Sequence, residues 1–417
     1  MEQSLFDNIT NINTKVDKNI VVKAKKPTVV SLFAGAGGMD LGFKKVGFDI
    51  VFANDFNEDA CKTYSNNIDK HIFCGDVSKI ANDDIPKNID ILIGGFPCQG
   101  FSIANKNRNM QDERNVLYKE MIRFIEVANP KIFVAENVKG LLSMEGGEII
   151  KIIIEDFKKI GYDVDFQLMN TAYFGVPQFR ERVIIMGNKI GVKNKFPQKT
   201  HGIDGGKPFI KMKDVCEHLQ NVEISYNTLQ IGLKTVHNHI ASTNVHDKFW
   251  ARKSNVKQEE ICDYLKEWRK KSGISTHKID EIFGYRHTAG HWFRKDNNSG
   301  SIPKPNDWIR LKEILKFDDK YDKAVTELEE RQIVFEQSLR ITNWDTPSDT
   351  ITATSPEIHI NKQRRLSVRE CAIIQTFPDD FVFYGSLNSM YRQIGNAVPV
   401  EFAKLIAECV KDMLYDK

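Results

Sequence analysis

The sequence predicts an α/β fold with a mostly parallel β-sheet that carries helices on both faces. Short apolar runs rich in β-branched residues alternate with segments of helical period from residue 27 to about residue 190. Several of these runs end at a glycine turn or at an acidic residue. Strands that alternate with helices form a parallel sheet, and ligands bind such a sheet at the carboxyl ends of its strands. Candidate functional residues should therefore follow the strands.

The predicted elements come in a regular order. The first is the strand PTVVSLF (27–33), followed by the glycine turn AGAGGMD and the helix LGFKKVGF (41–48). A helix at 117–130 has its apolar residues on one face and closes at Pro130. Further strands are predicted at 49–55, 70–76, 89–95, 131–137, 164–170 and 182–188. Beyond residue 190, helices are predicted at 259–273, 276–284, 306–315 and 398–414.

The composition is that of an ordinary globular protein. The 417 residues are 41% apolar and 28% charged. No apolar run approaches the ~20 residues that span a bilayer, and the first residues lack the order of a secretory signal, so we expect a cytoplasmic protein with no membrane contact. The seven cysteines form no C-x-x-C pair and no Cys/His cluster at zinc spacing, so neither a metal site nor a disulfide framework is expected.

The positive charge is concentrated in one region. The net charge of +3 is too small to demonstrate a polyanionic partner. Residues 191–300, however, hold 19 Lys and Arg against 12 Asp and Glu, and eight of the ten histidines. The basic surplus is therefore regional.

The glycine turn after the first strand indicates a ligand site. It consists of Phe33, Ala34, Gly35, Ala36, Gly37 and Gly38. Such a turn permits close backbone approach and offers helix N-terminal N–H groups to an anionic group, although a tight turn without a ligand is an alternative. It does not fit G-x-G-x-x-G, which counts against a dinucleotide site. Asp55 and Asp76 end the next two strands and can accept hydrogen bonds from ribose and adenine, which favours a nucleoside-bearing ligand.

Three further strand ends carry reactive side chains. Cys98 lies on a loop at the ligand edge and is a candidate nucleophile, although a packed, inert cysteine is equally compatible with its position. Glu136 follows a neighbouring strand and can pair with a ring nitrogen or share a proton. Arg180 and Arg182 lie two residues apart on one strand face, where structural salt bridging is their ordinary role.

These residues resemble, in order, the motifs of the C5-cytosine DNA methyltransferases of bacterial or phage restriction-modification systems, from about residue 28 to the end. The resemblance rests on Phe33–Gly38, Asp55 with Phe56, Asp76, Pro97-Cys98, Glu136-Asn137-Val138, Gln178-x-Arg180-x-Arg182, Arg365–Glu370 and Gln393–Pro399. The departures are small, since Asp55 stands where glutamate is commoner and Gly100 where alanine is common. Neither change removes a needed functional group.

The resemblance implies a fold, a cofactor and an organisation. The fold would be a class I (Rossmann-like) methyltransferase domain with a smaller, mixed target-recognition domain, and the methyl donor would be S-adenosylmethionine, released as S-adenosylhomocysteine. The cofactor-binding residues would be Phe33 to Gly38, Asp55, Phe56, Asp76, Val77, Gly95, Pro97, Leu117, Asn396 and Ala397. The expected parts are a leader (1–26), a catalytic domain (27–190 and 390–417), a target-recognition region (191–345) and the rest of the small domain (346–389).

The resemblance also implies a mechanism and a substrate. Cys98 would add to C6 of a cytosine flipped out of duplex DNA, Glu136 would hold N3, and Arg180 and Arg182 would anchor the O2 side, so that C5 can take the methyl group without a metal. The loop at 100–116 would act as a lid. From their chemistry, Ser102, Lys106 and Arg108 are expected to contact DNA phosphates, although a solvated surface loop is the commoner meaning of such residues. Arg286, His287, Thr288 and Arg294 are expected DNA contacts that can meet base edges, with plain phosphate contact or surface charge as the alternative for the two arginines. The residues Ile261, Leu265, Trp268, Trp292 and Trp308 are expected to form a core rather than to stack on bases.

Two alternative functions follow from the same motifs. Relatives that methylate tRNA cytosine carry a shorter recognition segment with a Cys-Phe-Thr signature, which is absent here. A DNA-binding repressor that keeps the fold without turnover would not need intact Cys98, Glu136 and Asp76. We therefore expect a monomeric DNA methyltransferase at the nucleoid, with the possibility of a restriction endonuclease that recognises the same site without direct contact.

Overall fold

The structure is a computed structural model that describes most of the chain. The described residues are 26–97, 116–242, 252–253, 258–283, 292–293, 303, 305–326, 329–330, 342–353, 357, 359 and 364–416. All structural statements below concern these residues.

A seven-stranded sheet forms the centre of the molecule, in the order β3-β2-β1-β4-β5-β7-β6. Strands β1 to β5 pair in parallel, and β7 is antiparallel to both of its neighbours. The strands are β1 (Thr28–Leu32), β2 (Asp49–Asp55), β3 (Ile72–Cys74), β4 (Ile91–Gly94), β5 (Ile132–Val138), β6 (Asp163–Asn170) and β7 (Glu181–Asn188). Each predicted strand is confirmed to within a few residues, and so is the mostly parallel α/β sheet.

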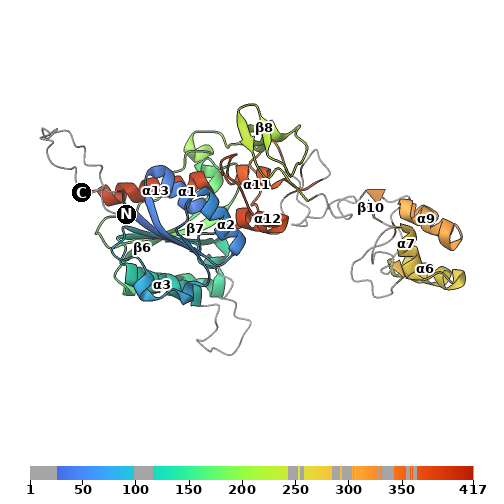
Figure 1. Cartoon of the computed structure of the whole chain (residues 1–417), viewed down its shortest axis with the longest axis horizontal. Coiled ribbons are helices and arrows are strands. Elements are labelled where there is room, and N and C mark those ends of the chain that lie inside the picture. Colours follow the sequence, from blue (N-terminus) through green and yellow to red (C-terminus); the bar gives the residue numbers. More distant parts are fainter. Residues whose placement is uncertain are drawn as a thin grey trace, which may run out of the picture.

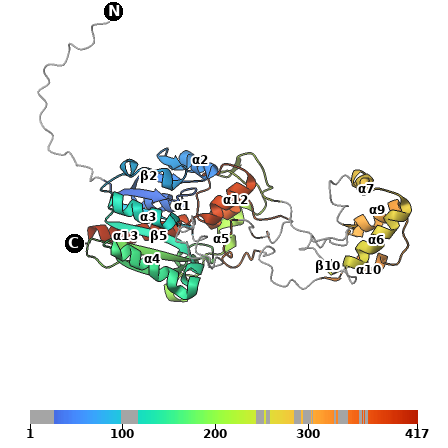
Figure 2. The same ribbon diagram turned by 90° about the horizontal axis from the view of Figure 1, so that it is seen from below.

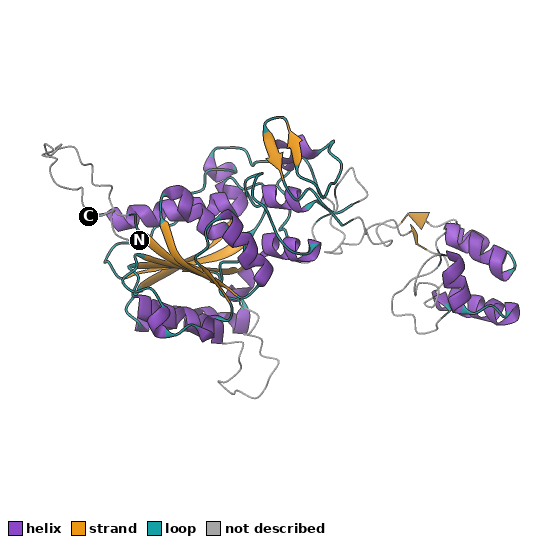
Figure 3. Ribbon diagram, viewed as in Figure 1, coloured by secondary structure: helices purple, strands orange, loops and turns teal. Residues whose placement is uncertain are grey.

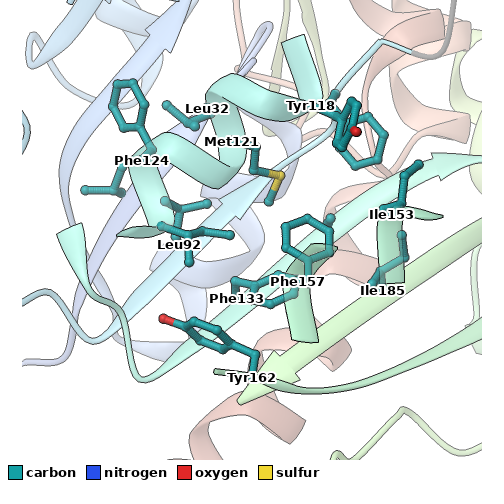
Figure 4. Packing of buried hydrophobic residues seen from close by; sticks show 14 of the residues in the cluster. Leu32, Leu92, Tyr118, Met121, Phe124, Phe133, Ile153, Phe157, Tyr162 and Ile185 are labelled. Carbon is teal, nitrogen blue, oxygen red and sulfur yellow. The ribbon is translucent and has the colours of Figure 1, made fainter. Parts of the chain in front are cut away.

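Helices cover both faces of this sheet, as Figures 1 and 2 show. One face carries α3 (Val116–Ala128) and α4 (Glu148–Lys159), and the other carries α1 (Gly38–Val46) and α13 (Val400–Tyr415). On the first face, Phe133 of β5 stacks within 4.4 Å of Phe157 from α4, and Met121 of α3 lies in the same cluster (Figure 4). Two separate apolar layers therefore hold the sheet rigid.

The amphipathic spacing of α4 explains its place. Ile150, Ile153, Ile154 and Phe157 fall at positions i, i+3, i+4 and i+7 and are all buried. On the opposite face α1 and α13 approach closely because Gly42 has no side chain, and a Cβ there would lie 2.5 Å from the Cβ of Ala403. The helix α2 (Glu58–Asn67) begins where the Asn57 side chain accepts a hydrogen bond from Ala60 N, as a helix cap does.

A second group of elements packs against α1 and α2. It comprises α5 (Met212–Cys216), the hairpin β8 (Leu229–Ile231) and β9 (Lys234–Val236), α11 (Val368–Ile374) and α12 (Leu387–Asn396). Its apolar cluster joins Met212, Ile240 and Leu366 to Tyr64 and Ile68 of the α2 region. Arg369 of α11 is fully buried and donates hydrogen bonds to the carbonyl oxygens of His237, Pro378 and Phe381. This group therefore packs on the side of the sheet domain that carries α1 and α2.

A third group, here called the helical unit, has its own core. It contains α6 (Gln258–Ser272), α7 (Thr276–Phe283), α9 (Pro305–Leu315) and α10 (Asp322–Thr326) and lies at one end of the molecule (Figure 3). Its cluster of buried residues shares no member with the other described clusters. Ile261, Leu265, Trp292 and Trp308 are buried in it and Trp268 packs against it, which confirms that these residues form a core.

Small elements complete the described chain. The pair β10 (Arg252–Lys253) and β11 (Glu329–Glu330) is antiparallel. Short 3₁₀ turns lie at Val77–Lys79, Asn82–Asp84, Lys139–Leu142, Met144–Gly147, Thr171–Phe174, Ile203–Gly205 and Glu217–Leu219. No described helix is long and apolar enough to cross a membrane. The domain boundaries expected at 190, 345 and 390 stay predictions, although the described part of 191–345 divides three ways: Val192 and Phe196 pack with the core of the sheet, and other parts belong to the second group and to the helical unit.

Candidate active site

A cavity of about 640 Å³ opens at the carboxyl ends of β1, β2, β4 and β5. This volume is that of a site for a cofactor-sized ligand. The predicted cofactor-binding residues that line it are Phe33, Ala34, Gly35, Gly38, Asp55, Phe56, Asp76, Val77, Gly95, Pro97, Leu117, Asn396 and Ala397. Residues from the first part of the sheet and residues from near the C-terminus therefore line the same cavity, as the sequence predicts.

Two predicted residues of the glycine turn do not line this cavity. Ala36 is buried in the apolar cluster beside α2. Gly37 caps α1 with φ 87°, and a Cβ there would lie 2.0 Å from Ile68 Cδ1. Both residues therefore face the α2 region rather than the cavity, and they fix the conformation of the turn.

Hydrogen bonds to Asp55 hold the turn in place. Its Oδ2 accepts from Gly35 N at 2.7 Å and its Oδ1 accepts from Asn57 N at 2.8 Å. Burial raises the pKa of Asp55, while the backbone N–H groups of Asn57 and Gly35 act in the opposite direction. Each carboxylate oxygen has a second acceptor position, which a ribose hydroxyl can use.

An aromatic ring and a second acid complete this end of the cavity. Phe56 leaves 78% of its surface exposed, although it is a large apolar side chain. An exposed ring on a cavity wall suits a planar heterocycle better than it suits water. Asp76 accepts a hydrogen bond from Ser78 N at 2.9 Å, which lowers the pKa of this carboxyl. An anionic acceptor and an apolar ring are the groups that an adenosine requires, so the residues present fit S-adenosylmethionine.

A buried carboxyl lies under the turn. Asp40 of α1 accepts hydrogen bonds from Ser31 Oγ at 2.9 Å and from the Tyr64 hydroxyl at 2.8 Å. The hydroxyl oxygen of Tyr64 also lies 3.0 Å from His71 Nε2. Burial raises the pKa of Asp40 to about 6, against the opposing effect of these hydrogen bonds.

The opposite end of the cavity holds a buried acid and an arginine. Glu136 ends β5 with 8% of its surface exposed, and its Oε1 lies 2.8 Å from Arg182 Nε. This is an ion-pair contact, because the Nε–H of Arg182 is not aligned for a hydrogen bond. A Cβ at Gly95 would lie 3.1 Å from Glu136 Oε2, so the glycine leaves room for the carboxylate. Asn137 Nδ2 donates to Phe96 O at 2.9 Å and fixes the chain just before residue 98.

Arg180 connects the strand β7 to the second group of elements. It is 1% exposed, and it donates to Ile351 O at 3.2 Å and to Gly395 O at 2.9 Å. Its Nε has no hydrogen-bond partner among the described residues. Burial lowers the pKa of Arg180, the charge of Arg182 adds to this effect, and Glu136 opposes it. Because Arg180 also lines the cavity, this unpaired Nε–H is a candidate hydrogen-bond donor to a substrate.

Two cavity residues on α12, Ser389 and Arg392, were not predicted from the sequence. They line the cavity together with Gln393, Gly395 and Asn396, which belong to the motif Gln393–Pro399. Ser389 and Arg392 stand seven and four positions before Asn396, so the helical period of α12 was the signal that could have suggested them.

Several predicted residues lie outside the described part of the chain. Cys98 is among them, and Pro97, the last described residue before it, lines the cavity. So are all the predicted DNA contacts, namely Ser102, Lys106, Arg108, Arg286, His287, Thr288 and Arg294. Among the described residues, no group of three or more His, Cys, Asp or Glu side chains could hold a metal ion.

The strand order and the cavity define a Rossmann-like, S-adenosylmethionine-dependent methyltransferase. The chain belongs to the C-5 cytosine-specific DNA methylase family, which it matches over residues 27–412. It is therefore an enzyme that uses S-adenosylmethionine to methylate C5 of cytosine in DNA.

Individual relatives agree with this assignment. The chain is 33% identical over 413 residues to the Type II methyltransferase M.NgoFVII of Neisseria gonorrhoeae, covering 96% of this chain and 91% of that one. It is 30% identical over 412 residues to the Type II methyltransferase M.FnuDI of Fusobacterium nucleatum, covering 93% and 95%. The crystal structure of a prophage-encoded DNA modification methyltransferase of E. coli has a TM-score of 0.57 and 21% identity, covers 93% of this chain and 99% of its own, and supports the fold alone.

Proposed function

We propose that Cys98 is the nucleophile of this DNA cytosine-5 methyltransferase. Cytosine C5 is a weak nucleophile, and addition of the Cys98 thiolate to C6 moves electron density to C5. The covalent intermediate is general to the family. Support for this residue comes from Pro97, which lines the cavity directly before position 98, and from Asn137, which holds the Phe96 carbonyl.

Glu136 is the proposed partner of cytosine N3. The pairing of Glu136 with Arg182 in the cavity that also holds Asp55 is the observation that carries the proposal. A carboxyl group at N3 stabilises the charge that gathers on the ring when C6 is attacked. Arg182 orients this carboxyl, and the unpaired Nε of Arg180 is the proposed donor to O2.

The cofactor is proposed to lie between the glycine turn and α12. Asp55 would bind its ribose, Phe56 would pack on its adenine, and Asp76 with Val77 would bind the edge of that ring. The bound cofactor supplies a methyl group on a sulfonium, which makes that methyl group electrophilic. Loss of the C5 proton and release of Cys98 then restore the aromatic ring.

The substrate is proposed to be a specific site in double-stranded DNA. The target base has to leave the duplex to reach Glu136, at a cost of a few kcal/mol. We assign recognition of the site to 191–345 and contacts with DNA to Ser102, Lys106, Arg108, Arg286, His287, Thr288 and Arg294. The relatives named above are Type II methyltransferases, so we also propose a restriction-modification role beside an endonuclease that reads the same site. One active site per chain and one flipped base per turnover make a monomer sufficient, and the substrate places the proposed activity at the nucleoid in the cytoplasm.

A covalent trap tests this proposal directly. A duplex that contains the methylation site with 5-fluorocytosine at the target position should become linked to Cys98, because fluorine cannot leave as a proton does. The variant Cys98→Ala should still bind S-adenosylmethionine but should transfer no tritiated methyl group to DNA. Methyl transfer by this variant, or an adduct at another residue, would contradict the proposal. Bisulfite sequencing of plasmid DNA from expressing cells identifies the site for the duplex.

A further inference from the structure

The charges of α6 are divided along its length. Its first half carries Glu259, Glu260 and Asp263, whereas its second half carries Lys266, Arg269, Lys270 and Lys271 together with one acid, Glu267. Lys266 and Lys270 are four residues apart and therefore project from the same side of the helix. Both side chains are exposed, and Ile261 and Leu265 on the other side are buried in the core of the helical unit.

These two lysines differ from the lysines of α4. Each lysine of α4 pairs with an acid three positions earlier, as Lys151 does with Glu148 at 2.8 Å. Within the described part of the chain, no carboxylate lies within ion-pair distance of Lys266 or Lys270. Among the described residues, therefore, no acidic neighbour neutralises their charge.

Arg269 extends the basic surface beside these lysines. Its guanidinium lies over the ring of Phe293, with 5.5 Å between Cζ and the ring centre, and its Nε has no hydrogen-bond partner in the described structure. Phe293 is buried, and the neighbouring Trp292 contacts Phe283 at the end of α7 with 5.7 Å between ring centres. The aromatic core therefore holds this side of α6 in a fixed orientation.

We propose that Lys266, Arg269 and Lys270, here called the α6 basic face, bind phosphates of one strand of the DNA substrate. The inference rests on the proposed recognition of DNA by 191–345 and assigns α6 to backbone positioning rather than to base reading. Phosphate contacts fix the register of a protein on the duplex without reading its sequence. Exposed basic residues that lack an acidic neighbour keep their full charge for such contacts.

Helix electrostatics offer another explanation for the same residues. Basic side chains in the last turns of a helix stabilise its C-terminus by about 0.3–1 kcal/mol. That role would need no DNA, so the test has to separate DNA binding from stability.

The test uses the full-length double variant Lys266→Gln/Lys270→Gln. Fluorescence anisotropy with a labelled duplex carrying the mapped methylation site gives Kd between about 0.05 and 0.2 M salt. Each lost phosphate contact lowers the slope of log K against log salt by about 0.9, so we expect a slope smaller by about 1.8 and a Kd roughly ten-fold weaker at the lowest salt. The KM for DNA should rise, and kcat at saturating DNA should not change.

Two controls make the result decisive. Lys316→Gln/Lys320→Gln removes two exposed charges of the same unit that lie beside Asp318 and Asp319, and it should leave the slope unchanged. Lys266→Arg/Lys270→Arg should restore the slope. An unchanged slope in the glutamine variant, with wild-type methylation intact, overturns the inference but leaves the proposed function standing. A wild-type protein that transfers no methyl group to DNA would instead remove the proposed function.

Discussion

The Asp55 side chain has two roles, because it holds the glycine turn in place and is also the proposed acceptor for the ribose of the cofactor. Both of its carboxylate oxygens accept backbone N–H groups, one from the glycine turn and one from the start of α2. An alanine would leave these N–H groups unpaired and would also remove the proposed ribose acceptor. Structure and binding therefore depend on the same residue, and a loss of activity at this position does not by itself separate them.

Asp40 should make the stability of the protein depend on pH. The pKa of this buried carboxyl is about 6 in the folded chain against 3.8 for an ordinary aspartate. Because the folded state holds the proton more tightly than the unfolded state, the free energy of unfolding falls as the pH rises from about 4 to about 6. The effect amounts to about 1–3 kcal/mol, at 1.36 kcal/mol for each unit of pKa.

Asp40→Asn measures this contribution. Urea unfolding of the wild type and the variant at several pH values gives the unfolding free energy of each. The value for the wild type minus that for the variant should fall as the pH rises from 4 to 6 and should be constant above that range. Parallel curves for the two proteins across that range would mean that Asp40 does not titrate there.

Residues at strand ends were predictable from sequence, whereas residues on remote elements were not. Asp55 and Glu136 each close an apolar run, and the rule that ligands bind at the carboxyl edge is enough to bring them together. Arg392 follows no strand, and only its distance from Asn396 along a helix connects it with the cavity. The helical spacing puts Arg392 on the same side of α12 as Asn396, but how α12 packs against the rest of the protein is not encoded locally.

Arg369 should be the main polar connection among the elements of the second group. Its three donors reach the carbonyl oxygens of His237, Pro378 and Phe381, and burial lowers the pKa of Arg369 to about 10. Arg369→Lys keeps the charge but cannot reach three separate acceptors, and we expect it to cost about 2–3 kcal/mol of stability. Chemical denaturation followed by tryptophan fluorescence measures this loss. Arg392→Lys on the exposed side of α12 is the matched control, and equal stability of both variants would contradict the prediction.

The elements differ in how well their sequences reveal them. The strands β1, β4 and β5 are buried on both faces, so they appear as continuous apolar runs that are hard to miss. The helix α2 has a mostly polar sequence and buries only Ala60, Cys61, Thr63 and Tyr64, which is too little to produce a clear helical period. For this reason α2 was not predicted from the sequence.

At the scale of the whole molecule, the helical unit should unfold without the catalytic domain. Trp308 is fully buried at its centre, and its Nε1 donates to Asp322 Oδ1 at 2.8 Å. Trp308→Ala should cost the unit about 3–5 kcal/mol, since it removes a large core side chain. We expect loss of amide-exchange protection in α6, α7 and α9, retained binding of S-adenosylmethionine, and a large loss of DNA methylation.

Phe157→Ala provides the opposite control for this prediction. Phe157 is fully buried between α4 and β5, so the variant should lose protection in the sheet and keep it in the helical unit. If either substitution lowered the protection of both parts equally, the two cores would be one cooperative unit.

The division of 191–345 could not have been read from the sequence. Nothing local in this range shows that Met212 packs with Leu366 while Trp308 packs with residues of the helical unit. Leu366 lies more than 120 residues from Met212 along the chain, and a distant contact leaves no local signal.

The placement of α12 and α13 has a consequence for the synthesis of the enzyme on the ribosome. Asn396 and Ala397 face the glycine turn near the start of the sheet, and α13 then closes on α1 through the gap at Gly42. A nascent chain therefore has no complete pocket for the methyl donor until translation has passed residue 397, and that face of the sheet is covered by α1 without α13 until translation reaches about residue 415. A polypeptide released early by a stalled ribosome would consequently be unable to modify a chromosome.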